Sequence, residues 1–207
     1  MKSRILDISE LEYWYTNHLN KDFPVNECKP MENILNLILD GKYDIYLYEE
    51  NETIIGYASI WKAEGNSTFL LDYLGVPYNL RNKGYGSMIL QDIRNQVTEK
   101  ENCSNNLKPG TSICLILETE TPETGDYSPE NKIRERRERF YMRNNYVKLY
   151  ELGTCGVRFN AMSYSDIPED LELTMIEHKK IYGPDRTDVV IPLPVGVDAP
   201  LPFWMQI

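Results

Sequence analysis

The chain has 207 residues, of which 42% are hydrophobic, and its formal net charge is −10. This length is enough for one well-buried domain and short for two. The acidic balance argues against a nucleic-acid-binding protein, which would present a basic surface, and is compatible with a cationic substrate or with simple solubility. No apolar run is long enough to span a bilayer, and residues 1–7 lack a signal-peptide core, so we expect a cytoplasmic protein without a membrane partner.

Hydrophobic periodicity predicts strands and helices in a regular succession along the chain. Strands are expected at residues 4–6, 43–48, 53–61, 67–76, 111–117, 146–150 and 156–164. Helices are expected from a cap at Ser9 to Leu19, from Pro30 to Gly41, from Ser87 to Val97, from Asn131 to Asn144 and from Asp166 to Tyr182. The segment 121–130 is polar, and residues 185–207 are rich in proline and in apolar side chains.

The cysteines do not predict a metal site. Cys28, Cys103, Cys114 and Cys155 show no C-x-x-C spacing and have no neighbouring histidines. This pattern indicates neither a zinc site nor a disulfide framework, and we expect no metal.

The stretch 70–91 joins an apolar strand to a helix through a loop that contains glycines. Pro77 ends the strand, because proline cannot donate a hydrogen bond to a neighbouring strand. Gly84 and Gly86 allow a ligand to approach the backbone, and the first N–H groups of the following helix have no partner within it. Together with the positive charges of Arg81 and Lys83, this arrangement predicts an anion site.

Two common phosphate-binding motifs do not fit this loop. A dinucleotide fingerprint requires a third glycine, and Ile89 stands in its place. A P-loop requires Gly-Lys-Ser/Thr, whereas Gly86 is followed directly by Ser87. The pattern that remains is Arg81-x-x-Gly84-x-Gly86 after an apolar strand, and the alternative to a ligand site is a tight turn that binds nothing.

The run Leu71–Pro77 followed by Arg81–Gly86 resembles the acyl-CoA-binding motif of the GNAT family of N-acetyltransferases, bacterial type. The resemblance covers about three quarters of the chain. It implies an α+β fold, the acyl-CoA N-acyltransferase fold, with a mixed, mostly antiparallel sheet that splays apart between its fourth and fifth strands and is flanked by helices. We expect a single N-acetyltransferase domain over residues 1–183. Residues 184–207 are expected to pack on this domain or on a partner subunit, for instance in a homodimer.

The resemblance also implies that acetyl-CoA is the cosubstrate. Backbone N–H groups of residues 82–87 would hold its pyrophosphate, and main-chain groups of residues 74–76 would face the pantetheine arm and the thioester oxygen. The expected coenzyme-binding residues are Leu74, Gly75, Val76, Arg81, Asn82, Lys83, Gly84, Tyr85, Gly86 and Ser87.

The run Arg139–Tyr146 resembles the second motif of the family, with Asn145 in place of the usual glycine. Asparagine tolerates the left-handed conformation that ends a helix at this position. The resemblance makes Tyr141 the general acid, because a phenol with a pKa of ~10 is protonated at neutral pH and can protonate the leaving thiolate. The alternative is that Tyr141 only packs beside Phe140 and Tyr146.

Several carboxylates are candidates for the general base, and the sequence does not choose among them. Asp72 lies in the strand before the loop, in phase with Leu74, and Glu118 and Glu120 end the neighbouring strand. Asp72 could instead be a structural hydrogen-bonding group and the glutamates solvated strand ends, and a base could act through water.

The sequence therefore predicts an N-acetyltransferase that transfers an acetyl group from acetyl-CoA to a primary amine on a small molecule or a peptide. Direct attack in a ternary complex is expected, since neither motif contains a cysteine that could carry the acetyl group. The alternative is a non-catalytic CoA-binding or regulatory module with the same fold.

Overall fold

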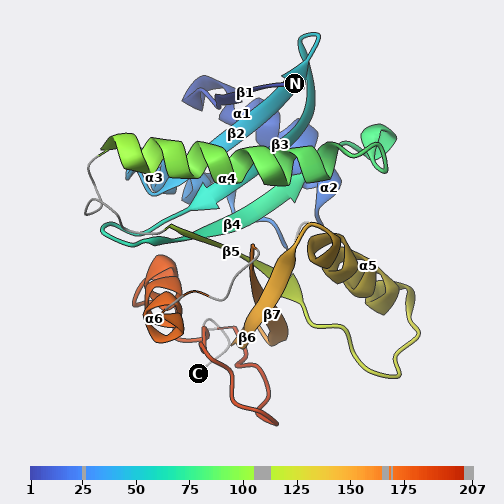
Figure 1. The fold of residues 1–207 in the computed structure, drawn as a ribbon, viewed down its shortest axis with the longest axis vertical. Helices are drawn as coiled ribbons and strands as arrows, with labels where there is room; N and C mark the ends of the chain where they lie inside the picture. The colour runs from blue at the N-terminus through green and yellow to red at the C-terminus, as the bar shows by residue number, and fades with distance from the viewer. Residues whose placement is uncertain (25–26, 105–112, 165–167, 169, 203–207) are drawn as a thin grey trace. The chain divides into compact units, whose positions relative to one another are not determined.

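Figure 1 shows the fold of the chain as a computed structural model. The structure describes residues 1–24, 27–104, 113–164, 168 and 170–202, and it describes only the helical backbone of residues 101–104. Three parts of the predictions lie outside these ranges: strand residues 111–112, the helix start at Asp166 and the last residues of the C-terminal extension, 203–207.

Across the described residues, seven strands form one mixed, mostly antiparallel sheet in the order β1-β2-β3-β4-β5-β7-β6, and helices flank it. This arrangement confirms the predicted fold class. The chain divides into two compact units. Unit 1 comprises residues 1–64 and 71–109, and unit 2 comprises residues 65–70 and 110–207.

Unit 1 contains β1 to β3, the end of β4, and the helices up to α4. Its strands are β1 (Lys2–Ile5), β2 (Tyr43–Glu50), β3 (Thr53–Trp61) and the last residues of β4 (Thr68–Gly75). Its helical segments are the 3-10 helix Ile8–Glu10, α1 (Leu11–Trp14), the π-helical turn Tyr15–Leu19, α2 (Asn20–Asp22), α3 (Met31–Leu39), the 3-10 turn Tyr78–Leu80 and α4 (Tyr85–Ser104). In Figure 1, α4 crosses the near face of β2 and β3, whereas α1, α2 and α3 lie behind these strands.

The first helical segment corrects one detail of the prediction. Asp7, not Ser9, is its N-cap, because the Asp7 carboxylate accepts a hydrogen bond from the Ser9 backbone N–H at 2.9 Å. Glu10 completes a capping box by accepting from the backbone N–H of Asp7 at 3.2 Å. An aspartate two residues earlier therefore satisfies the free N–H groups that the serine was expected to satisfy.

Unit 2 contains the remaining strands and helices. They are β5 (Cys114–Glu120), α5 (Pro129–Arg143), β6 (Tyr146–Thr154), β7 (Val157–Tyr164) and α6 (Leu171–Tyr182). Strand β7 pairs with β5 and with β6, antiparallel to both. Asn145, between α5 and β6, has a φ of 63°, which confirms that asparagine adopts the left-handed conformation there.

The C-terminal segment after α6 packs on β6 of the same unit. Val189 and Leu193 are buried, and the backbone of Val190 exchanges hydrogen bonds with Gly153 at 2.9 and 3.1 Å. The backbone N–H of Leu193 donates to the carbonyl of Glu151 at 2.8 Å. The described part of the proline-rich extension thus adds backbone hydrogen bonds to the edge of β6 and buried side chains to the core of unit 2.

Candidate active site

The end of β4 is held to the helices of unit 1 through Tyr57. A Cβ added to Gly75 would lie 2.1 Å from the Tyr57 ring, so the ring packs directly on the backbone. The Tyr57 hydroxyl donates to Asp22 at 3.2 Å, and Arg81 donates to the same carboxylate at 2.6 Å. Arg81 also donates to the carbonyl of Val76 at 2.9 Å. The hydrogen bonds of Arg81 therefore fix the conformation of the loop that carries it.

The loop itself is open toward the solvent. Residues 81–84 are exposed, and Asn82 and Gly84 have φ values of 64° and 89°. No heavy atom lies within 4 Å of a Cβ built on Gly84. Within the described residues, the backbone N–H groups of residues 82–86 have no protein acceptor, and those of residues 87 and 88 donate to the carbonyl of Gly84. Successive free N–H groups at the start of a long helix form an anion site.

The carboxylate of Asp72 is already paired. Lys29 donates to its oxygens at 2.6 and 2.8 Å, and the Tyr43 hydroxyl donates to it at 2.5 Å. The side chain of Asp72 is 10% exposed. Burial, together with the charge of Asp72, raises the pKa of Tyr43 well above its usual value, so this phenol stays a donor. The sequence did not single out Lys29 or Tyr43, since neither belongs to a motif.

In unit 2, Tyr141 lies near the end of α5 and is half-buried. Its ring contacts those of Phe140 and Tyr146 edge to face, at centroid distances of 5.2 and 5.9 Å. The structure describes no hydrogen bond of the Tyr141 hydroxyl within the residues it covers. Desolvation raises its pKa above the usual value of a phenol, although Arg137 opposes this shift, so the hydroxyl carries its proton at neutral pH.

The carboxylate of Glu118, on β5, belongs to a hydrogen-bonded group in unit 2. The Tyr182 hydroxyl donates to it at 2.7 Å, and Nε2 of His178 lies 2.8 Å from its Oε1. Nδ1 of the fully buried His178 lies 2.9 Å from the Tyr150 hydroxyl. The other carboxylate at this end of β5, Glu120, is paired with Arg134.

His178 and Tyr182 are absent from the sequence prediction because both lie on α6, beyond the motifs. A single histidine on an amphipathic helix has no spacing that points to a partner. Only the packing of α6 in unit 2 brings them to Glu118.

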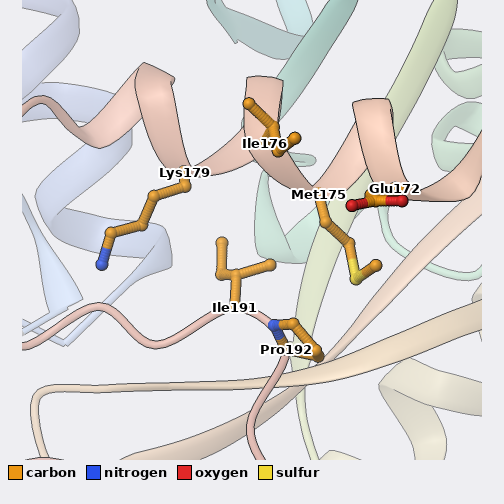
Figure 2. A pocket seen from close by; sticks show the side chains of 6 residues that line it. All are labelled: Glu172, Met175, Ile176, Lys179, Ile191 and Pro192. Carbon is orange, nitrogen blue, oxygen red and sulfur yellow. The ribbon is translucent and has the colours of Figure 1, made fainter.

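A separate hollow of about 490 Å³ lies between α6 and the C-terminal segment of unit 2. Figure 2 shows its lining, with Met175, Ile191 and Pro192 around an apolar space. None of its lining residues belongs to the motifs, so this hollow carries no part of the predicted site.

The predicted residues thus fall into two groups. Unit 1 holds Asp72, residues 74–76 and the loop 81–87, and unit 2 holds Glu118 and Tyr141. Within unit 1, Asp72 lies on β4 and the loop 81–87 follows this strand.

Comparisons with known proteins concern the family and the fold. Residues 10–109 match the sequence model of the Acetyltransferase (GNAT) family. No curated protein is detectably similar to the chain in sequence.

Solved structures share the fold at low sequence identity. A GNAT-family acetyltransferase from Bacteroides thetaiotaomicron is 16% identical with a TM-score of 0.59, over 89% of this chain and 99% of its own. An aminoglycoside 6'-N-acetyltransferase complexed with coenzyme A is 14% identical with a TM-score of 0.60, over 82% and 99% of the two chains. The ribosomal-protein-S18-alanine N-acetyltransferase from Escherichia coli is 10% identical with a TM-score of 0.55, over 82% and 97%.

The fold is that of the GNAT acetyltransferases among the solved structures, and just under half of the chain matches the family's sequence model. The segment that matches the GNAT family model, residues 10–109, contains the loop after β4 and agrees with the resemblance found in the sequence. None of the described helices is long and apolar enough to cross a membrane.

Proposed function

We propose that the chain is an N-acetyltransferase that transfers an acetyl group from acetyl-CoA to a primary amine by direct attack in a ternary complex. The observation that carries the proposal is the row of backbone N–H groups from residue 82 to residue 86, at the start of α4, which have no acceptor in the described part of the chain. This row supplies donors and partial positive charge for a pyrophosphate, and the open space beside Gly84 lets the anion reach them.

Residues 74–76 follow as the segment for the pantetheine arm and the thioester. Leu74 and Val76 are half-buried, whereas Gly75 is buried against Tyr57. This packing holds the end of β4 rigidly, which favours a fixed position for the reacting carbonyl. In unit 2, Tyr141 is the proposed general acid, because its phenol is protonated at neutral pH.

Asp72 and Glu118 are the proposed carboxylates for proton removal from the amine. Lys29 and Tyr43 donate to Asp72 and fix its orientation, and Tyr182 does the same for Glu118. The acceptor is a primary amine on a small molecule or a peptide. Both kinds are named among the proteins of similar fold, as an aminoglycoside and as the alanine of a ribosomal protein.

Isothermal titration with acetyl-CoA and with CoA tests the coenzyme site. The wild type is expected to bind both in the micromolar range, and Gly84→Glu is expected to lose binding, because it puts a carboxylate where the pyrophosphate lies. Gly125→Glu is the matched control, since Gly125 has a similar φ of 84° and equally open surroundings in a loop of unit 2. Failure of the wild type to bind either ligand would remove the proposal.

A non-catalytic CoA-binding module is the second candidate. It predicts normal binding of acetyl-CoA with no release of CoA thiol across a panel of amines. Release of CoA thiol that depends on an added amine would support the N-acetyltransferase and contradict the non-catalytic module.

A further inference from the structure

The side-chain ammonium of Lys29 is enclosed in unit 1 by a carboxylate and two aromatic rings. It lies 2.6 and 2.8 Å from the oxygens of Asp72, 4.5 Å from the centroid of Trp61 and 5.3 Å from that of Tyr73. Trp61 and Tyr73 are buried, and the lysine side chain is 23% exposed. A carboxylate with aromatic faces around it is the chemistry that proteins use to bind an alkylammonium group.

The backbone that carries Lys29 is anchored independently of this charge. The Lys29 N–H donates to the Tyr73 hydroxyl at 2.9 Å, and its carbonyl accepts from the Tyr15 hydroxyl at 3.0 Å. The Tyr73 hydroxyl in turn donates to the carbonyl of Glu27 at 2.9 Å. The flexible side chain can therefore leave the enclosure by rotation about its own bonds, while the loop stays in place.

The position along β4 relates this enclosure to the coenzyme segment. Asp72 and Leu74 are two residues apart on β4, a rise of ~7 Å along the strand. The ammonium of Lys29, bound to Asp72, thus marks a cation position two residues before the β4 segment that is proposed to hold the thioester.

The charges around the enclosure favour a cation over a neutral ligand once the Lys29 side chain has left. Without Lys29, the Asp72 carboxylate would lack its paired cation at 10% exposure, beside Tyr43 and Tyr73, whose pKa values are raised by burial and by Asp72 itself. Neutral phenols cannot compensate a buried carboxylate, so a cation is the favoured occupant.

We propose that Asp72, Tyr43, Trp61 and Tyr73 form an ammonium site for the acceptor amine, and that Lys29 occupies this site in the free protein until a cationic acceptor displaces it. The role as acceptor site rests on the proposed function, whereas cation binding does not. The ligand class is an alkylammonium group at the end of a small molecule or a peptide side chain.

The test uses tetramethylammonium, which carries the same single positive charge as the ligand group and cannot be acetylated. Its binding is followed by the indole N–H signal of Trp61 in NMR spectra, assigned with Trp61→Phe. Lys29→Met is expected to bind the cation at least ~10-fold more tightly than the wild type, since the internal competitor is gone. The neutral isostere tert-butanol is expected to leave the signal in place. Lys42→Met is the matched control, because Lys42 forms an exposed pair with Asp40.

Lys29→Gln is a second variant in case loss of the ion pair prevents folding, since glutamine can still donate to Asp72. For the wild type itself, tetramethylammonium is expected to accelerate modification of Lys29 by trinitrobenzenesulfonate, measured by mass spectrometry. The inference is overturned if the folded variants bind the cation no better than the wild type, or bind tert-butanol equally well, or if the modification rate of Lys29 is unchanged.

Titration of the same proteins with acetyl-CoA separates this inference from the proposed function. Cation binding without acetyl-CoA binding would support the ammonium site and contradict the proposal that the protein is an acetyltransferase. When both bind, tetramethylammonium is expected to inhibit turnover competitively against the amine, and Lys29→Met is expected to lower the KM of the amine. Inhibition that is not competitive would overturn the assignment to the acceptor.

Discussion

Single side chains in this protein gain their chemistry from burial and from their neighbours. Tyr141 is an example: its phenol is half-buried among aromatic rings, and desolvation keeps it protonated. Asp188 is the opposite case, since the charge and the hydrogen bonds of Arg186 hold a buried carboxyl in its ionised form. Both residues permit a quantitative prediction.

Tyr141→Phe is expected to lower kcat by ~10²- to 10⁴-fold, because the leaving thiolate then lacks its proton donor. The Kd of acetyl-CoA, from isothermal titration, should stay the same. Tyr127→Phe is the matched control, as Tyr127 is 82% exposed in the loop before α5. A normal kcat in Tyr141→Phe would leave Tyr141 as a packing residue.

The free energy of unfolding is expected to fall below about pH 5 as Asp188 becomes protonated. Burial alone would raise the pKa of Asp188, but Arg186 and Cys155 outweigh it, and the pKa lies well below the usual range. Because the folded pKa is depressed, the stabilisation is complete above the unfolded value of ~3.9 and is lost as the pH falls toward the folded value.

Asp188→Asn removes this contribution at neutral pH. We expect a loss on the order of 2 kcal/mol at pH 7 and a smaller difference from the wild type at acidic pH, measured by urea unfolding across the pH range. Asp185→Asn, which neutralises an exposed carboxylate nearby, should follow the wild type. Equal pH dependence of Asp188→Asn and the wild type would contradict the assignment.

At the scale of elements, the junction of β4 and its loop depends on close backbone packing. Tyr57 of β3 fills the space beside Gly75, and its hydroxyl donates a hydrogen bond to Asp22, which also accepts from Arg81. Burial raises the pKa of Asp22, and Arg81 and Tyr57 oppose this shift. A change at Gly75 is therefore expected to disturb both the strand end and the anion loop.

Gly75→Ala is expected to lower the free energy of unfolding by about 1–3 kcal/mol, because the new Cβ would lie 2.1 Å from the Tyr57 ring. Chemical denaturation measures the effect. In a double-mutant cycle with Tyr57→Val, the alanine should cost less, since the smaller side chain gives it room. Additive effects would show that the strain lies elsewhere.

At the scale of the whole chain, the net charge of −10 favours the approach of cations. The KM of a cationic amine is therefore expected to rise as the ionic strength increases to ~0.15 M, where charges are screened beyond ~8 Å. The KM of acetyl-CoA, an anion, should not rise over the same range. A salt-independent KM for the amine would mean that the net charge serves solubility alone.

The sequence was sufficient for the order of strands and helices along the chain and for the turn that joins β4 to α4. Proline, glycine and hydrophobic alternation act locally, so the strand before Pro77, the turn at Gly84 and the left-handed residue Asn145 could be predicted from their neighbours. The helix cap was misplaced from Asp7 to Ser9, because both side chains cap well and only the backbone geometry selects one.

Local pattern determined which segments form strands and helices, and the motif pointed to the family whose model matches residues 10–109. Only the tertiary structure decided the partners of the carboxylates: Asp72 with Lys29 across 43 positions of the chain, and Glu118 with His178 and Tyr182 from α6. The physical reason is that ion pairs and hydrogen bonds require atoms within about 3 Å. Packing brings such atoms together from distant positions, and no spacing in the sequence records it.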